Sequence, residues 1–573
     1  MTSTSIYDFG RFRLDMGGRL LFRDGERIAV TPKAVEVLIA LVESRGKHLN
    51  REELLHAAWG DTAVEEGSLT SQISLLRKVL GEEFIETIPK RGYRFLEPAK
   101  KVAEAQGHLP QIQSLAVLPL ENLGPDPDDE HFADSMTEAL ITDLAKISSL
   151  RVVSRTTIMR YKNTQKSLPE IGRELNVDAV VEGSVQHEGD RVRIRARLVH
   201  AATDHHLWAE AYDRDLRDIL ILQNEVARAI AQQVQAKLTP EEQARLSTAR
   251  PVQPEAYELC IKGRYFWAKR TEKSIHRAIE CFQRAITLDP SYAAAHSGLA
   301  DCYSSLGFSF DVGSERPGDV QPKARTAAMK ALELDDSLAD AHNSLAYVML
   351  NYDWDWPGAE VEFKRALELN PGNPHAHHWY AHLLLSGGRH SEALAESNRA
   401  LQLDQLSPIM NVHLGWHYLY SGLYDEAIDQ LTNTVELDPN FGLTYWYRGL
   451  AYEQKGMYED ALRELSKAKT LLQAIPIVEG DTAHLHSVSG KKSEAERTLM
   501  KLMKESASRY VNPYEIALIY VGLGQREKAL VWLDTAFRER SDMLVYLGVD
   551  RRLDSIRPDV RFTSLVRRIG IPT

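Results

Sequence analysis

The chain has 573 residues, a formal net charge of −12 and 43% hydrophobic residues. Its length is too great for a single core, so we expect three or four domains of globular composition. No apolar run approaches the roughly 18 residues that a membrane-crossing helix needs. The first residues, Met1 to Ser5, lack the cationic and apolar blocks of a signal peptide. We therefore expect a soluble, cytoplasmic protein with no membrane partner.

Cysteine content and charge distribution narrow the protein class further. Cys260, Cys281 and Cys302 are too few for a disulfide framework, and their spacing fits no metal motif. We expect buried, reduced thiols. Residues 1–101 hold nearly equal numbers of basic and acidic residues, whereas the remainder is strongly acidic. Positive charge that could meet nucleic acid is therefore concentrated near the start of the chain.

The first part of the chain has the pattern of short strands followed by helices. Residues 7–14, 19–23 and 27–30 are predicted as strands. Thr31 and Pro32 then predict the start of a helix, because threonine is a favoured N-cap and proline fits the first helical position. A second helix is expected over residues 51–59, where it ends at a glycine.

A third helix is predicted over residues 68–80, and its two faces differ in chemistry. At about 100° per residue one stripe is apolar and consists of Leu69, Ile73, Leu76 and Leu80. The opposite face is short, polar and cationic, and consists of Thr70, Ser71, Ser74, Arg77 and Lys78. Hydroxyl and arginine side chains can reach base edges in a DNA major groove, and lysine can reach phosphate. A solvated helix face is the alternative interpretation.

A basic β-hairpin follows this helix. Residues 84–88 and 93–95 are predicted as its strands, and the turn between them carries Lys90 and Arg91. The sequences GSLT, LRKVLG and IETIPKRGYRF within residues 67–95 resemble the carboxyl-terminal winged-helix domain of the OmpR/PhoB family. The resemblance covers about residues 5–97 and is closest to the CadC/ToxR-like branch. It implies that residues 68–80 form the recognition helix and that Lys90 and Arg91 lie at the wing tip, near the minor groove. Thr87 completes the DNA-binding candidates, and we assign residues 1–97 to this domain. We expect no receiver domain before it, so the input signal should come from elsewhere in the chain.

A linker and an α/β domain are expected next, over residues 98–113 and 114–240. The linker is polar and cannot span a membrane, unlike the tethers of CadC and ToxR. One predicted strand, residues 192–199, alternates apolar residues with Arg191, Arg193, Arg195 and Arg197. We interpret these arginines as a solvated sheet face, with a phosphate or nucleic-acid contact as the alternative. The region resembles the TolB amino-terminal-like domain, which implies no catalytic residues.

The last part of the chain repeats with a period of 34 residues. Small residues recur at fixed offsets, as at Gly388, Gly422, Gly456, Gly490 and Gly524. This period and the LDP-like repeat ends resemble the tetratricopeptide repeat. We predict an all-α solenoid of eight units over residues 254–541 and a closing helical cap over residues 542–573.

The predicted concave face of the repeats carries polar and aromatic side chains. His375, His378 and His382 lie at i, i+3 and i+7 on one helix. Equivalent positions in neighbouring repeats are Asn343, Tyr347, Trp416, Tyr420 and Trp446. Such a groove suits a peptide or a small ligand, although a polar lining without a dedicated ligand, a pH-responsive patch and a zinc site remain open. Because no carboxylate accompanies the histidines, we predict no metal and no cofactor.

These patterns favour one function over two others. Motifs for phosphate loops, dinucleotides, serine hydrolases and zinc proteases are absent from the sequence, so we predict no enzyme. The favoured hypothesis is a one-component, sequence-specific transcriptional regulator. Its winged helix binds double-stranded DNA as a homodimer, and its repeats bind a protein or a small ligand. The alternative is an interaction scaffold in which the winged helix is a docking module. A third hypothesis is an enzyme related to nucleotide cyclases. It is suggested only because domains like the middle one also occur in proteins with cyclase domains.

Overall fold

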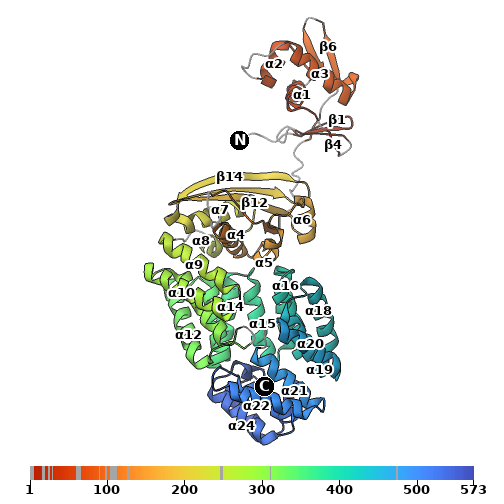
Figure 1. Cartoon of the computed structure of the whole chain (residues 1–573). Helices are drawn as coiled ribbons and strands as arrows, with labels where there is room; N and C mark the ends of the chain where they lie inside the picture. The colour runs from red at the N-terminus through yellow and green to blue at the C-terminus, as the bar shows by residue number, and fades with distance from the viewer. Residues whose placement is uncertain are drawn as a thin grey trace. The chain divides into compact units, whose positions relative to one another are not determined.

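The computed structural model describes residues 6–15, 20–23, 26–28, 30–44, 46–59, 66–89, 91–96, 100–102, 112–124, 130–245, 250–309, 312–472 and 475–572. The chain forms two compact units, Met1–Gln111 and Ile112–Thr573 (Figure 1). The first is an α+β winged-helix fold, and the second joins an α/β domain to an all-helical solenoid, as the sequence predicts. Among the described residues, no helix is both long and apolar enough to cross a membrane.

The first unit contains two small sheets and three helices. The first sheet has the order β4-β3-β2-β1-β8, with β1(Ile6–Phe9), β2(Phe12–Asp15), β3(Leu20–Arg23), β4(Glu26–Ile28) and β8(Lys100–Val102). The single strand predicted over residues 7–14 is therefore two strands, because Gly10 has a φ of +54° and turns the chain. Strand β8 pairs with β1 although it lies inside the predicted linker, so residues 100–102 of that linker belong to this sheet.

The three helices and the hairpin follow the predicted order. They are α1(Pro32–Glu43), α2(Arg51–Trp59) and α3(Glu66–Leu80), with a sheet of order β5-β7-β6 made of β5(His48–Leu49), β6(Ile85–Ile88) and β7(Gly92–Phe95). Thr31 caps α1 by accepting a hydrogen bond from the Ala34 amide. The predicted apolar stripe of α3 is confirmed, since Leu69, Ile73, Leu76 and Leu80 are all buried. A side chain at Gly92, where φ is +126°, would meet the Leu49 carbonyl at 1.9 Å, so only glycine lets β7 pass this close to β5.

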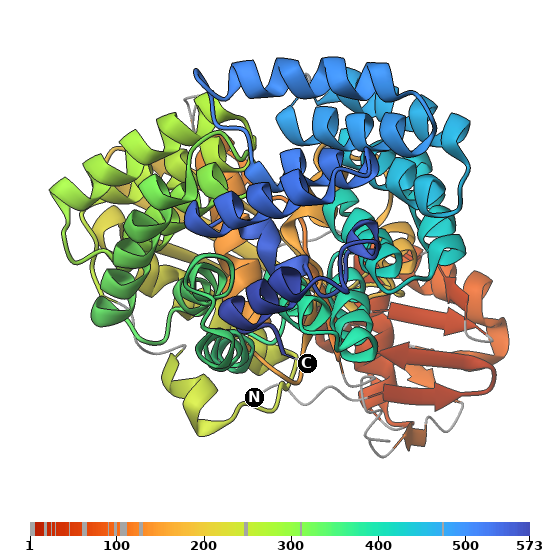
Figure 2. The same ribbon diagram turned by 90° about the horizontal axis from the view of Figure 1, so that it is seen from below.

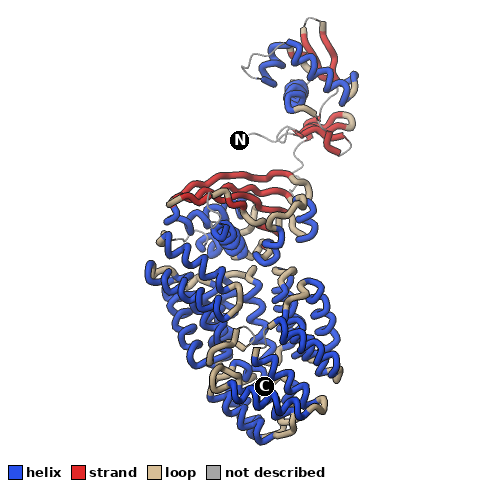
Figure 3. Tube along the Cα trace, in the orientation of Figure 1, coloured by secondary structure: helices blue, strands red, loops and turns tan. Residues whose placement is uncertain are grey.

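The α/β domain of the second unit has a six-stranded mixed sheet. Its main order is β11-β9-β12-β13-β14, with β11(Arg151–Val152), β9(Ser114–Val117), β12(Ala179–Glu188), β13(Arg191–His200) and β14(His205–Asp215), and β10(Glu121–Asn122) pairs with β12. The helices are α4(Glu130–Ala145), α5(Arg155–Ile158), α6(Leu168–Leu175), α7(Ile219–Gln233) and α8(Pro240–Arg245). Helices α4 and α7 cover one face of the sheet (Figure 3).

The opposite face of this sheet carries the four arginines of β13, and all four are exposed. Arg191 and Arg193 pair with Asp213 on β14, and Arg197 pairs with Glu182 on β12 at 3.0 Å. Because neighbouring carboxylates on the same sheet neutralise these cations, the solvated face is the interpretation that the structure supports.

Antiparallel helix pairs follow from residue 254. They are α9(Pro254–Trp267) and α10(Glu272–Leu288), α11(Ala293–Gly307) and α12(Pro317–Leu334), α13(Ala339–Val348) and α14(Trp356–Leu369), α15(Pro374–Ser386) and α16(His390–Leu403), α17(Pro408–Tyr420) and α18(Tyr424–Leu437), α19(Gly442–Gln454) and α20(Tyr458–Leu471), α21(Pro476–Val488) and α22(Lys492–Glu505), and α23(Pro513–Gly522) and α24(Arg526–Arg538). The recurring glycines lie between the helices of a pair with φ of +72° to +85°, the left-handed region in which glycine ends a helix. Of the cysteines, Cys260 and Cys302 are buried and Cys281 is half-buried.

Residues 542–572 do more than cover the last repeat. They contain η6(Asp542–Tyr546), η7(Arg551–Leu553) and α25(Val560–Ile569), and they fold back against earlier repeats. Asp542 accepts hydrogen bonds from Ser309, and the Trp356 indole donates to the Ile569 carbonyl at 3.0 Å. In Figure 2 this dark blue segment lies between the green and the teal helices. The last part of the chain therefore lines the inside of the solenoid that precedes it.

Candidate functional site

The exposed face of α3 is the candidate nucleic-acid interface of the first unit. The side chains of Thr70, Ser71, Ser74 and Lys78 are exposed, on the side of the helix opposite to the buried leucines. This face offers three hydroxyls and one cation, which are groups that can contact base edges and phosphates in a major groove. Lys90 lies outside the described residues, and Arg91 at the hairpin turn is exposed.

Arg77 and Thr87, which are both predicted to contact DNA, form a hydrogen bond with each other. The Arg77 guanidinium donates to the Ile85 carbonyl at 2.7 and 3.0 Å and to Thr87 Oγ1 at 2.7 Å. These bonds tie α3 to the first strand of the hairpin. Arg77 therefore contacts the hairpin in this structure, and its predicted base contact stays a prediction.

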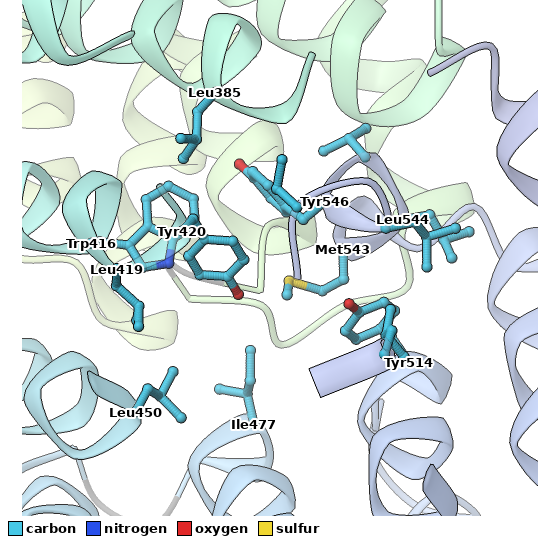
Figure 4. Packing of buried hydrophobic residues seen from close by; sticks show 14 of the residues in the cluster. Leu385, Trp416, Leu419, Tyr420, Leu450, Ile477, Tyr514, Met543, Leu544 and Tyr546 are labelled. Carbon is cyan, nitrogen blue, oxygen red and sulfur yellow. The ribbon is translucent and has the colours of Figure 1, made fainter. Parts of the chain in front are cut away.

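Part of the predicted repeat groove is closed. Trp416, Tyr420 and Trp446 are all buried, at 0%, 7% and 1% exposure. Figure 4 shows Trp416 and Tyr420 facing Met543 and Tyr546 of the carboxyl-terminal segment. The Trp446 indole donates to Asp481 Oδ2 at 2.7 Å. These three side chains are therefore buried in the core, because other side chains of the same protein fill the part of the groove that they were predicted to line.

The other five predicted groove residues line one cavity of about 700 Å³, and they are Asn343, Tyr347, His375, His378 and His382. The α/β domain forms a wall of this cavity through α4 and α5. The Ser154 amide donates to the Leu403 carbonyl at 3.2 Å, and the Thr157 hydroxyl donates to Asp404 at 2.8 Å. The Gly372 amide donates to the Ala145 carbonyl at 3.1 Å. The cavity thus lies between the α/β domain and the concave face of the repeats.

Several polar atoms in the cavity wall lack partners. Within the described residues, neither Asn343 Oδ1 nor Asn370 Oδ1 has a hydrogen-bond partner, and both side chains are more than nine-tenths buried. Burial raises the pKa of Asp301, also in the wall, to about 7, although the Ser344 hydroxyl donates to it. Buried unpaired carbonyl oxygens are costly, so a molecule that donates hydrogen bonds would be stabilised here.

Histidines of two neighbouring repeats meet at one end of this cavity. His382 Nε2 lies 2.8 Å from His378 Nε2 and 3.1 Å from His413 Nδ1. Burial lowers the pKa of His375, His378 and His382 below the ordinary value, and lowers that of His413 to about 3. The spacing along one helix groups His375 with His378 and His382 and does not include His413. The signal for it was a second HxxxH pair, His413 and His417, on the first helix of the next repeat.

Four family models match the chain. "Transcriptional regulatory protein, C terminal" matches residues 25–95, and "HilA/YgeH-like transcriptional regulator, second domain" matches residues 111–229. Two tetratricopeptide-repeat models match residues 355–410 and 413–473. The region that resembles the TolB amino-terminal-like domain thus falls largely within the HilA/YgeH-like match.

Curated relatives support the same organisation. The transcriptional regulator HilA of Salmonella typhi is 25% identical over 402 residues, which are 69% of this chain and 70% of HilA. The transcriptional activator CadC of Escherichia coli is 29% identical over 17% of this chain and 20% of CadC. A Rhizobium meliloti protein named "Putative adenylate cyclase 3" is 36% identical, but the chain spans only 43% of its length.

These matches agree with the geometry of both units. The residues matched by the first model include α3 and the hairpin of β6 and β7, and those matched by the last two form helix pairs. The chain carries the winged helix of transcriptional regulatory proteins, the second domain of HilA/YgeH-like regulators and tetratricopeptide repeats, which together are the organisation of a HilA/CadC-like transcriptional regulator.

Proposed function

We propose that the regulator binds double-stranded DNA through the exposed face of α3. Thr70, Ser71 and Ser74 read base edges, while Lys78 and the wing-tip residues Lys90 and Arg91 contact backbone phosphate or the minor groove. Arg77 and Thr87 hold the hairpin so that helix and wing fit one site. The observation that carries this proposal is the row of exposed hydroxyls beside Lys78, on a helix whose opposite face is fully buried.

The DNA contact is tested on the full chain with a fragment recovered by genomic DNA pull-down. Each phosphate contact contributes about one unit to the dependence of log K on log salt. Lys78→Ala should lower that slope by about one unit on every fragment, whereas Ser74→Ala should reduce discrimination between fragments. Arg13→Ala is the matched control, since Arg13 is an exposed cation on β2 that pairs with Asp8. If Arg13→Ala and Lys78→Ala change the slope equally, α3 is not the interface.

We also propose that two chains occupy tandem half-sites, because one winged helix makes few contacts and binds weakly alone. The measurement is the mass of the protein–DNA complex on fragments with one or two half-sites. A complex with a single chain on both fragments would contradict dimeric binding.

The cavity of the second unit is proposed as the sensory site. Asn343 and Asn370 present unpaired carbonyl oxygens, so the ligand is a small polar molecule with N–H or O–H donors. Its binding would alter the contact between repeats and α/β domain, and through it the DNA occupancy. Native mass spectrometry of the purified chain should detect a bound molecule that Asn343→Leu loses. Asn398→Leu, at an exposed asparagine of α16, should retain it.

We propose that the chain regulates without an enzymatic activity of its own. More than half of the cyclase-named relative lies outside the part that this chain matches. Incubation of the purified chain with ATP and magnesium should therefore produce no cyclic AMP, and steady production that co-purifies with the chain would contradict the proposal.

A further inference from the structure

Three histidine nitrogens converge on one point in the interior of the second unit. His378 and His382 lie one turn apart on α15, and His413 lies on α17 of the next repeat. His382 Nε2 is 2.8 Å from His378 Nε2 and 3.1 Å from His413 Nδ1. The three ligand atoms all lie within 4.8 Å of one another, and all three side chains are buried. Side chains from two neighbouring repeats therefore meet in one compact group.

Hydrogen bonds alone satisfy this group poorly. A neutral imidazole has one N–H and one lone pair, so His382 Nε2 can serve well only one of the two nitrogens that face it. His378 Nδ1 is buried and has no hydrogen-bond partner among the described atoms. A cation at the point of convergence would instead accept a lone pair from each of the three residues. Zinc–nitrogen bonds of about 2.0–2.1 Å place ligand nitrogens about 3.3 Å apart in a tetrahedral site, close to the two distances observed here.

The surroundings of the three histidines also suit a cation. Metal ions bind the neutral imidazole through a lone pair. Carboxyl groups that could offset part of the positive charge line the same cavity, and they belong to Asp301, Asp340 and Asp404.

We propose that His378, His382 and His413 bind one transition-metal ion of the Zn²⁺ class, with a coordination position open to the cavity. All three side chains line the cavity of about 700 Å³. Three protein ligands and one open position are typical of zinc centres that bind a further molecule, whereas structural zinc sites have four protein ligands. His417 Nε2 and the Tyr546 hydroxyl each lie 3.4 Å from His382 Nδ1, so they orient the His382 ring from outside the coordination sphere.

The open position points to the chemistry of the cavity ligand. A carboxylate or another anionic oxygen donor completes a three-histidine zinc site. Arg270 lines the same cavity and carries a positive charge. A small molecule with a carboxylate would thus meet both the ion and Arg270. This choice of ligand rests on the proposed sensory role of the cavity, whereas metal binding itself does not.

The test uses the full chain stripped with a chelator and then titrated with Zn²⁺ and Co²⁺. We expect one ion per chain, a higher Tm with the ion than without it, and the visible bands of four-coordinate cobalt with nitrogen and oxygen ligands. His378→Gln, His382→Gln and His413→Gln should each lose stoichiometric binding. His375→Gln should keep it, because His375 is a half-buried cavity residue of the same helix that lies outside the three ligands.

Three results would overturn the metal site. The first is a folded wild-type chain that binds neither ion. The second is binding by all three ligand variants that equals binding by the wild type. The third is a thiolate-to-cobalt absorption band, which would place the ion at a cysteine. X-ray absorption of the zinc-loaded wild type counts its histidine ligands directly, so the proposal stays testable if a variant fails to fold. Addition of a carboxylate such as acetate should shift the cobalt bands if the open position faces the cavity. Because none of these measurements involves DNA, they succeed or fail independently of the proposed DNA contact.

Discussion

Tyr546 of the carboxyl-terminal segment packs edge-on against Trp416 of α17, with ring centroids 5.1 Å apart and an interplanar angle of 76°. Tyr420, one turn further along α17, lies 5.8 Å from the same tyrosine. Concave faces of repeat solenoids are usual binding surfaces. Here the protein fills part of that face with its own chain (Figure 4), and a cavity of about 700 Å³ lies beside the α/β domain.

Tyr546→Ala should destabilise the second unit by about 3–5 kcal/mol, because it removes a fully buried aromatic ring and leaves a cavity beside Trp416. Urea unfolding followed by tryptophan fluorescence measures the change. Tyr546→Phe keeps the ring and should cost much less. Tyr458→Ala is the control, since Tyr458 is 38% exposed. Equal losses for Tyr546→Ala and Tyr458→Ala would show that the segment is not packed as described.

Arg552→Met should destabilise the chain by about 3–5 kcal/mol, because it leaves two buried carboxylates without their partner. The Arg552 guanidinium pairs with Asp481 on α21 and, at 2.8 Å, with Asp550, and all three side chains are at least 95% buried. Adding Asp481→Asn to Arg552→Met should recover part of the loss. The neighbouring Arg551 has a 59% exposed side chain, so Arg551→Met should have little effect on the urea midpoint. If Arg551→Met lowered the stability as much as Arg552→Met, the loss would come from the net charge of residues 542–572 and not from the buried ion pairs.

The stability contribution of Asp542 should depend on pH. Burial raises its pKa from 3.8 to about 6 in the folded chain, although Ser309 donates two hydrogen bonds to it. Because the folded pKa lies above the unfolded one, the protonated carboxyl favours folding, and this contribution is lost as the pH rises from about 4 to about 6. The Tm of Asp542→Asn relative to wild type should therefore rise over this range. Asp534→Asn, at a half-exposed side chain of α24, should show no such trend.

Arg77→Ala should destabilise the winged helix by about 1–3 kcal/mol, since it removes the hydrogen bonds to Ile85 and Thr87. Thr87→Val removes only the hydroxyl acceptor and should cause a smaller loss of stability. If these residues position the wing, both variants should weaken binding to all DNA fragments in proportion to that loss. A variant that keeps full stability but loses discrimination between fragments would show that Arg77 reads bases directly.

Local sequence patterns determined the kinds of element and their order. The stripe of Leu69, Ile73, Leu76 and Leu80 predicted a helix with one buried face, since amphipathic periodicity reflects burial directly. The glycines spaced by 34 residues predicted helix pairs, because each sits where the chain needs a left-handed conformation. The same periodicity predicted the polar face of α3, because the residues opposite the buried stripe must face solvent.

Only the tertiary structure decided which side chains meet across long separations. Periodicity marked Trp416, Tyr420 and Trp446 as groove residues, but it could not show that Tyr546 covers the groove, because that contact joins repeats to a segment more than a hundred residues later. The partners of Arg77 likewise depended on how the hairpin folds back on α3. The histidine group formed because neighbouring repeats stack in register and bring His413 beside His382. The packing of one repeat on the next sets the distance between these histidines, so it cannot be inferred from the spacing of residues within one helix.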